Sequence, residues 1–206
     1  MPGEQGVAAV SAGVCIVWMA AMFGCAGPQP LARAINPKDE EAYAALLADH
    51  TQTPAQAFLA DKSRSLGISL EEASRRDAAL STSSNPFDAR RDQAAVSRGA
   101  VIYSHECMEC HGEHADGRGP SLPIAVDSLN FHRTALRWDI TMRGGAVKKW
   151  FKTIQDGATA QATRPDGTPI TLQMPAFSQR LTREQTWLVI TYLQSMDRDL
   201  PPETAR

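Results

Sequence analysis

The feature that most constrains this chain is the run Cys107-Met108-Glu109-Cys110-His111. Two thiols three positions apart can each add across a vinyl group of one porphyrin. The histidine that follows directly can then coordinate the iron at its centre. A Cys-x-x-Cys-His run is the attachment signature of c-type haem. We therefore expect a fold whose elements wrap around a large, flat, apolar group.

Other functions of paired cysteines fit the sequence less well. A structural zinc site needs two more Cys or His ligands at suitable spacing. Cys15 and Cys25 lie in an N-terminal apolar segment, and His105 and His114 are typical of exposed loop histidines. A redox-active Cys-x-x-Cys is expected in a βαβ context, and no β-rich alternation surrounds this one. The run therefore favours covalent haem over zinc or thiol chemistry.

Length and charge set the outer limits. The chain has 206 residues and a net charge of −2, which is room for one ordinary domain plus an appendage and gives no indication of nucleic-acid binding. We expect three parts: residues 1–25 as a signal peptide, lipoprotein signal or N-terminal membrane anchor, 26–87 as a partly helical linker or docking segment, and 88–206 as the haem domain.

The N-terminal part is apolar and uncharged from Val7 to Phe23. This length lies between a signal-peptide core and a membrane-spanning helix. Its end, Met22-Phe23-Gly24-Cys25, resembles a bacterial lipoprotein cleavage box, which implies lipid on Cys25. An uncleaved helical anchor and cleavage at Ala32-Arg33-Ala34 stay open. Each alternative places the main body on the periplasmic side, and we favour the lipid.

The second part is rich in Ala, Ser, Asp, Glu and Arg. We expect a short helix over residues 39–48, with Tyr43, Leu46 and Leu47 on its apolar side. Ser69-Leu70-Glu71-Glu72 is a capping box that opens a helix to about Leu80. Because large apolar residues are few, this part is not expected to form a core of its own. It is either a tether or a segment that docks on a partner subunit.

From about Asp88 one helical face carries Ala95, Val96, Gly99, Ala100 and Tyr103, and it leads into the haem motif. With that motif, residues 88–198 resemble a bacterial class I (mono-haem) cytochrome c. The resemblance implies an all-α fold around one haem c, covalently attached through Cys107 and Cys110. It also implies that Gly99 and Tyr103 pack against Val189 and Tyr192 of a C-terminal helix, where a glycine lets two backbones approach closely.

The resemblance also implies the ligands of the iron. His111 is the proximal ligand, and the carbonyl of Pro120 accepts a hydrogen bond from the Nδ1–H of His111. Met174, in a Met-Pro run, binds the iron on the opposite side. Met142 is a rival that lacks the following proline, and Met108 cannot reach the far side of the ring.

Four further patterns place the rest of the domain. A helix ended by Asp156-Gly157 carries apolar residues on one side and lysines on the other: Val147, Trp150, Phe151 and Ile154 against Lys148, Lys149 and Lys152. The lysines form a solvated face or a docking patch for an acidic partner. Residues 161–173 are expected to form a turn-rich loop. Leu136, Trp138, Ile140 and Met142 are expected to line the pocket. A Thr182–Gln185 capping box opens a helix to about Met196.

These observations predict an electron carrier rather than an enzyme. Histidine–methionine ligation leaves no open site on the iron and is associated with a raised potential. The expected role is one-electron transfer by a membrane-tethered carrier, or by a subunit of a respiratory or photosynthetic complex. The alternative is the haem subunit of a periplasmic dehydrogenase or a sulfur-oxidising enzyme. The expected partners are redox proteins or membrane-complex subunits, and not nucleic acid.

Overall fold

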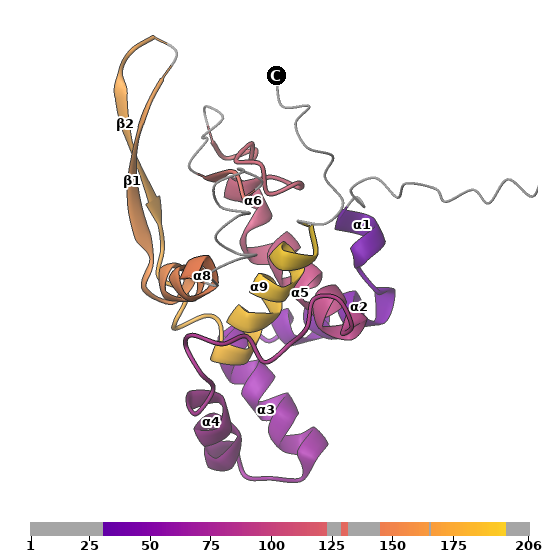
Figure 1. The fold of residues 1–206 in the computed structure, drawn as a ribbon. Coiled ribbons are helices and arrows are strands. Elements are labelled where there is room, and N and C mark those ends of the chain that lie inside the picture. Colours follow the sequence, from indigo (N-terminus) through magenta and orange to yellow (C-terminus); the bar gives the residue numbers. More distant parts are fainter. Residues whose placement is uncertain (1–30, 123–128, 132–144, 165, 197–206) are drawn as a thin grey trace, which may run out of the picture.

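A computed structural model describes residues 31–122, 129–131, 145–164 and 166–196 of the chain. Its centre is a pair of crossing helices, α5 (Gln93–Glu106) and α9 (Arg183–Met196). Helix α8 (Gly145–Asp156) lies against α9, and the one-turn helix α6 (Met108–His111) follows α5 (Figure 1). The fold of the described residues is mostly helical, as the sequence predicts.

The α5–α9 crossing is unusually close at Gly99. A Cβ atom at this position would lie 2.0 Å from the carbonyl oxygen of Leu188 and 3.0 Å from the Cβ of Tyr192. One turn further along, the rings of Tyr103 and Tyr192 pack with their centroids 5.2 Å apart. The predicted packing of Gly99 and Tyr103 on the C-terminal helix is therefore confirmed.

The first turn of α9 has a hydrogen-bond acceptor for each of its N–H groups. The predicted capping box is present, because Gln185 N donates to Thr182 Oγ1 over 3.0 Å and Gln185 Oε1 accepts from Thr182 N over 2.9 Å. The two preceding N–H groups, of Arg183 and Glu184, donate to the carboxylate of Asp77 over 2.9 and 2.8 Å. A carboxylate at a helix N-terminus also interacts favourably with the helix dipole.

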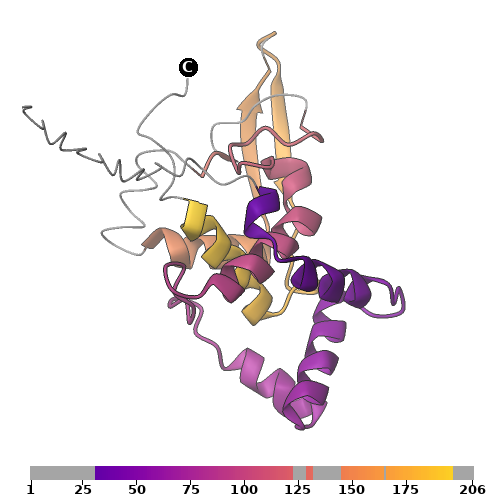
Figure 2. The ribbon, with the colours of Figure 1, turned by 90° about the vertical axis from the view of Figure 1, so that its right-hand side faces the viewer.

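Asp77 belongs to an N-terminal extension, defined here as residues 31–87, that packs on the crossing helices. It consists of α1 (Leu31–Ala34), α2 (Pro37–Leu47), α3 (Pro54–Leu66) and α4 (Leu70–Ala78). Helices α1 and α2 contact α5, and α4 contacts α9. Figure 2 shows the α3–α4 hairpin projecting below this body. Leu31 and Tyr43, each 5% exposed, join the core of the crossing helices. The extension thus packs on its own chain, and docking on a partner subunit stays a prediction.

Hydrogen bonds to buried polar groups hold the extension in place. The indole N–H of Trp187 donates to the carbonyl of Ser81 over 2.8 Å. The side chain of Asn85 donates to Thr191 Oγ1 over 3.0 Å, and the buried Ser97 hydroxyl accepts from the backbone N–H of Asn36 over 2.8 Å. Because buried polar groups are costly without partners, α5 and α9 depend on the extension for their stability.

An Asp77→Ala substitution tests this dependence. It leaves the N–H groups of Arg183 and Glu184 without the carboxylate, and hydrogen bonds to charged groups contribute about 1.5–3 kcal/mol. We expect the free energy of unfolding, measured by chemical denaturation of the full chain, to fall by that amount. Glu71→Gln, at an exposed position of the same helix, should change it by less than about 0.5 kcal/mol. Equal effects of the two variants would contradict the capping role.

The segment that was expected to be a turn-rich loop contains a β-hairpin. Strand β1 (Ala158–Thr163) pairs antiparallel with β2 (Pro169–Met174), from Ala158 opposite Met174 to Thr163 opposite Pro169. The hairpin projects beyond the helices from the end of α8 (Figure 1). Half-buried and exposed residues alternate along most of both strands. The loop prediction was wrong here, although the turn itself does lie at Asp166-Gly167.

Several predicted features lie outside the described residues. These are the segment 1–25 with Cys25, and the pocket-lining residues Leu136, Trp138, Ile140 and Met142.

Helix α3 was not predicted from the sequence, although it begins at a capping box formed by Thr53 and Gln56. None of the helices in the described ranges is both long and apolar enough to cross a membrane.

Candidate haem-binding site

The Cys-x-x-Cys-His run lies where α5 ends. Cys107 caps the C-terminus of α5, and α6 then carries Cys110 and His111 through one helical turn. Both thiols are free, with Cys107 buried and Cys110 exposed. The turn therefore presents two cysteines and a buried histidine within a few residues of one another.

The segment after the motif folds back onto it. A Cβ on Gly119 would lie 2.3 Å from the carbonyl carbon of Cys110, so only a glycine fits this approach. The N–H of Gly117 donates to the carbonyl of His111, and that of Ser121 to the carbonyl of Glu109, each over 3.0 Å. Gly112 has a φ of +82°, which favours glycine. These contacts fix the backbone around the histidine.

His111 is 8% exposed. Burial lowers the pKa of its imidazole, while the backbone carbonyl of Leu129 opposes this shift. Its Nδ1 is buried and has no hydrogen-bond partner among the described residues. A neutral imidazole can bind a metal through one ring nitrogen while the other donates a hydrogen bond to a neighbouring group, and the free Nδ1 of His111 is available for that second contact. The hydrogen bond predicted between Nδ1 and the carbonyl of Pro120 is not formed in this structure, where Pro120 is exposed, and it stays a prediction.

Two aromatic rings continue from the histidine towards α8. The ring of His111 lies 5.3 Å from that of Phe131, and Phe131 meets Trp150 edge-on with centroids 5.1 Å apart. The sequence placed Trp150 on the apolar side of its helix, and that side is buried as predicted: Val147, Trp150, Phe151 and Ile154. Phe131 was missed, because no periodic pattern surrounds it.

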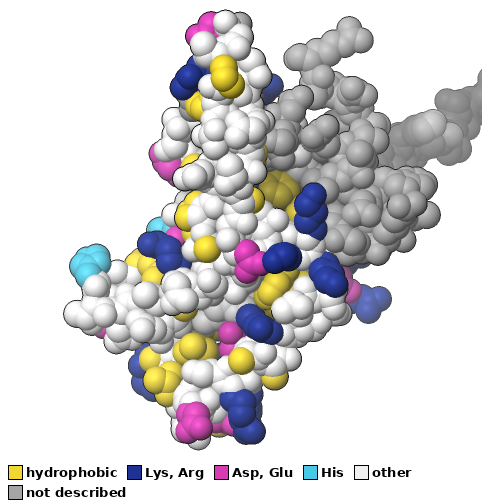
Figure 3. Space-filling model, turned by 90° about the vertical axis from the view of Figure 1, so that its left-hand side faces the viewer, with side chains coloured by type: hydrophobic (Ala, Val, Ile, Leu, Met, Phe, Trp, Pro, Cys, Tyr) yellow, Lys and Arg dark blue, Asp and Glu magenta, His cyan; other side chains and the backbone are white. Residues whose placement is uncertain are grey.

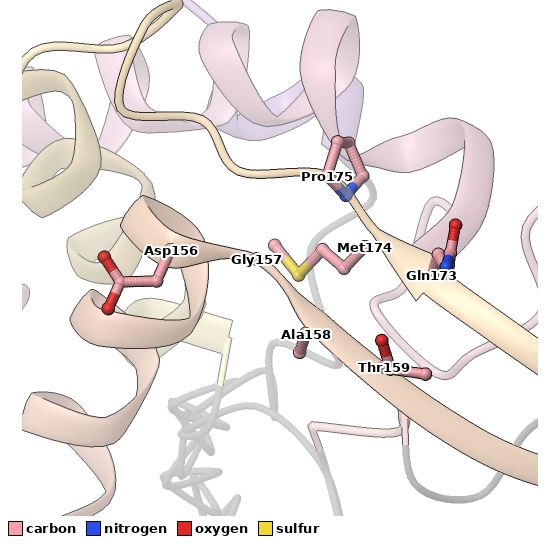
Figure 4. A pocket seen from close by; sticks show the side chains of 7 residues that line it. All are labelled: Asp156, Gly157, Ala158, Thr159, Gln173, Met174 and Pro175. Carbon is pink, nitrogen blue, oxygen red and sulfur yellow. The ribbon is translucent and has the colours of Figure 1, made fainter.

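Met174 is the last residue of β2. It is half-buried and packs against the core, and its side chain extends across the hairpin towards Gly157 and Ala158 (Figure 4). These residues line a shallow pocket together with Asp156, Thr159, Gln173 and Pro175. Gly157 has a φ of +77° and lies close to the backbone of Met174. A larger residue would not fit at this position, because its Cβ would lie 2.7 Å from the carbonyl oxygen of Met174.

The other candidate ligands are oriented differently. Nε2 of His105 lies 2.8 Å from a carboxylate oxygen of Glu40 in the extension, and His114 is exposed. Within the described ranges, no group of three or more His, Cys, Asp or Glu side chains is arranged to hold a metal ion. The free cysteine pair, the buried imidazole and the aromatic rings beside it fit a covalently bound haem.

Comparison with known proteins agrees with this fit. Residues 94–193 match the family model for cytochrome c oxidase, cbb3-type, subunit III. The cbb3-type cytochrome c oxidase subunit FixP of Sinorhizobium medicae (strain WSM419) is 33% identical over 104 residues, which cover 50% of this chain and 31% of that protein. The chain thus matches under a third of its curated relative. No solved structure matches the chain.

The fold and the matches together define a c-type cytochrome. A domain of this class holds a covalently attached haem c. Within the class, the haem domain of this chain is similar to subunit III of cbb3-type oxidases.

Proposed function

We propose that this protein transfers single electrons through one haem c that its own residues ligate on both sides. The observation that carries the proposal is the buried imidazole of His111 at the end of a turn with two free cysteines. When bound, the haem supplies an iron that alternates between the ferric and ferrous states. With that chemistry the protein would accept one electron from a reduced partner and pass it to an oxidised one.

Cys107 and Cys110 are the proposed attachment residues. Each thiol would add across one vinyl group, with its sulfur bonding to one carbon and its hydrogen going to the other, so that nothing is released. Cys107 is in the core and Cys110 is exposed. The two proposed attachment points therefore differ in exposure, one lying in the core and the other at the surface.

His111 and Met174 are the proposed axial ligands. Nε2 of His111 would bind the iron, and its Nδ1–H would donate to a backbone carbonyl, for which Pro120 is the candidate. Met174 would provide a thioether, a soft ligand that favours ferrous iron and so raises the potential. The firm packing of its backbone on Gly157 supports this role, because a neutral thioether needs its chain to hold it in place.

The similarity to oxidase subunits supports a partner in a respiratory membrane complex. A periplasmic dehydrogenase or a sulfur-oxidising enzyme is the alternative partner. Lys148, Lys149 and Lys152 are exposed on α8, and Figure 3 shows Lys and Arg side chains gathered below the hairpin. This lysine-rich face suits an acidic partner. A partner bound there would be close to the haem motif, because the opposite side of α8 carries Trp150, whose ring contacts Phe131 next to His111.

We further propose a periplasmic location with a lipid on Cys25. The burial of Leu31 supports processing before α1, because cleavage after Ala34 would remove a residue that is 5% exposed in the core. The proposed boundaries remain 1–25 for the signal or anchor, 26–87 for the extension and 88–206 for the haem domain.

An optical spectrum tests the ligation. The full chain, produced with c-type maturation, should show a low-spin haem c spectrum when oxidised and when reduced. The reduced protein should not react with carbon monoxide, because both axial positions are filled. A high-spin spectrum, or one that shifts with carbon monoxide, would contradict ligation on both sides. Haem that acid-acetone extracts from the protein would contradict covalent attachment.

A further inference from the structure

Glu106, directly before Cys107, is a carboxylate in the interior of the domain. Its side chain is only 5% exposed. A buried carboxylate costs free energy unless it is paired with a cation and accepts hydrogen bonds. Glu106 has both a cation and a hydroxyl beside it, and they come from two other parts of the chain.

The cation is Arg180, in the segment between Met174 and α9. Its Nε and Nη2 donate to Glu106 Oε2 over 3.1 and 2.9 Å, and Nη2 also lies 3.1 Å from Oε1. Such fork-shaped pairing of guanidinium and carboxylate is strong and directional. The N–H groups of Arg180 and Leu181 donate to the carbonyl of Phe177 over 2.9 and 2.7 Å. A rigid turn therefore connects Arg180 to the chain that carries Met174.

The hydroxyl is that of Tyr43, in the N-terminal extension. It donates to Glu106 Oε1 over 3.4 Å, and the tyrosine ring packs on that of His105 with centroids 5.3 Å apart. Burial raises the pKa of Tyr43 above its ordinary value, so the phenol stays protonated and can donate. Tyr43 is 5% exposed and thus covers this side of Glu106.

We propose that Glu106, Arg180 and Tyr43, here called the Glu106 cluster, hold the methionine-bearing segment in place relative to the haem motif. The cluster joins the residue before Cys107 to the turn after Met174 and to the extension. Its members are positioning residues, because they would act on the haem only through the residues that bind it. This inference rests on the proposed ligation by His111 and Met174, and it assigns the extension a part in keeping the methionine bound.

The cluster matters most when the iron is oxidised. A thioether is a soft ligand and binds the harder ferric ion less well than the ferrous ion. Added imidazole can therefore compete with Met174 for the ferric haem. How readily it does so reports how firmly the protein holds the methionine.

The test is an imidazole titration of the ferric, full-length protein, followed optically. Glu106→Gln keeps the shape of the side chain and leaves Arg180, which is 55% exposed, in contact with solvent. We expect its affinity for imidazole to rise at least about tenfold, which corresponds to about 1.4 kcal/mol. Tyr43→Phe, which removes only the hydroxyl and its hydrogen bond to Glu106, should give a smaller rise of about threefold, because a single hydrogen bond holds less firmly than the ion pair.

Asp77→Ala is the matched control, because it lowers stability without touching the cluster. Its imidazole affinity should stay within about twofold of the wild type, a difference below about 0.5 kcal/mol. If Glu106→Gln fails to fold, Arg180→Lys decides the matter: it keeps the charge but loses the fork geometry, so the affinity should still rise. An unchanged affinity in the folded Glu106 or Arg180 variant, or an equal rise in Asp77→Ala, would overturn the proposal.

The wild type and Met174→Ala separate this inference from the ligation on which it rests. If Met174 binds the iron, the ferric wild type shows the near-infrared charge-transfer band of methionine-ligated haem, and Met174→Ala takes up imidazole far more tightly. Absence of the band, with equal imidazole affinity in the two proteins, would overturn the ligation and the inference together. With the band present and Glu106→Gln like the wild type, the inference alone fails.

Discussion

A Met174→Ala variant is expected to retain covalent haem but to bind carbon monoxide once it is reduced. The substitution removes the proposed thioether ligand and leaves one axial position of the iron open. Its midpoint potential should fall by the order of 0.1–0.3 V, within the range of about 0.8 V that axial ligands span. Potentiometric titration and a carbon monoxide difference spectrum measure the two effects.

Two other methionines provide controls for this result. Met142→Ala and Met108→Ala should leave the potential and the carbon monoxide response close to those of the wild type. Met142 is the rival ligand in the sequence, and Met108 lies between the attachment cysteines in α6. If Met142→Ala reproduces the predicted loss and Met174→Ala does not, the axial ligand is Met142.

A Gly99→Val variant should lose much of the stability of the fold. Its first side-chain carbon would lie 2.0 Å from the carbonyl oxygen of Leu188, which is backbone and cannot rotate away. The crossing of α5 and α9 would have to open, and the core beside it would repack. Overpacking of this kind costs about 1–3 kcal/mol and occasionally more, and we expect at least the upper value. For a chain of this size the melting temperature should fall by roughly 6–12 °C.

Gly67→Ala is the matched control for the added side chain. Gly67 lies in the α3–α4 turn with a φ of +62°, and a Cβ there would have nothing within 4 Å. Only the left-handed backbone conformation opposes the substitution, at a cost of about 1–2 kcal/mol. A Gly99→Val protein that melts no lower than Gly67→Ala would show that the two helices can separate at little cost.

The elements that the sequence predicted well are those with a strong helical period and a capping signal. Helix α9 begins directly after the predicted capping residue Thr182, and α8 ends at Asp156 as expected. Helix α5 buries the predicted face. In such segments the apolar face, the cap and the breaker indicate the same boundaries, so local signals suffice.

The hairpin was missed although its signals are present. Ala160, Ala162, Ile170 and Leu172 lie at alternating positions on either side of the Asp166-Gly167 turn, a pattern typical of two paired strands. The alternation is weak, because alanine is small and threonine and glutamine fill the other face. Proline at 165 and 169 also favoured a loop.

The packing of the extension could not be read from the sequence at all. Its apolar residues are sparse, and the contacts that fix it are single long-range hydrogen bonds, such as Asp77 to α9 and Ser81 to Trp187. No period or spacing marks such pairs. Phe131, which packs against the ring of His111, was not predicted either, because no period or spacing in the sequence marks that contact.

If Cys25 carries the proposed lipid, the burial of Leu31 limits how far the haem domain can move from the membrane. Had residues 26–87 been a loose tether, the domain could range widely. Since the folded body already begins at α1, a lipid on Cys25 would leave only residues 26–30 between membrane and protein. Fully extended, these span at most about 20 Å. A domain held this closely would exchange electrons with complexes in the same membrane and would not act as a diffusing shuttle.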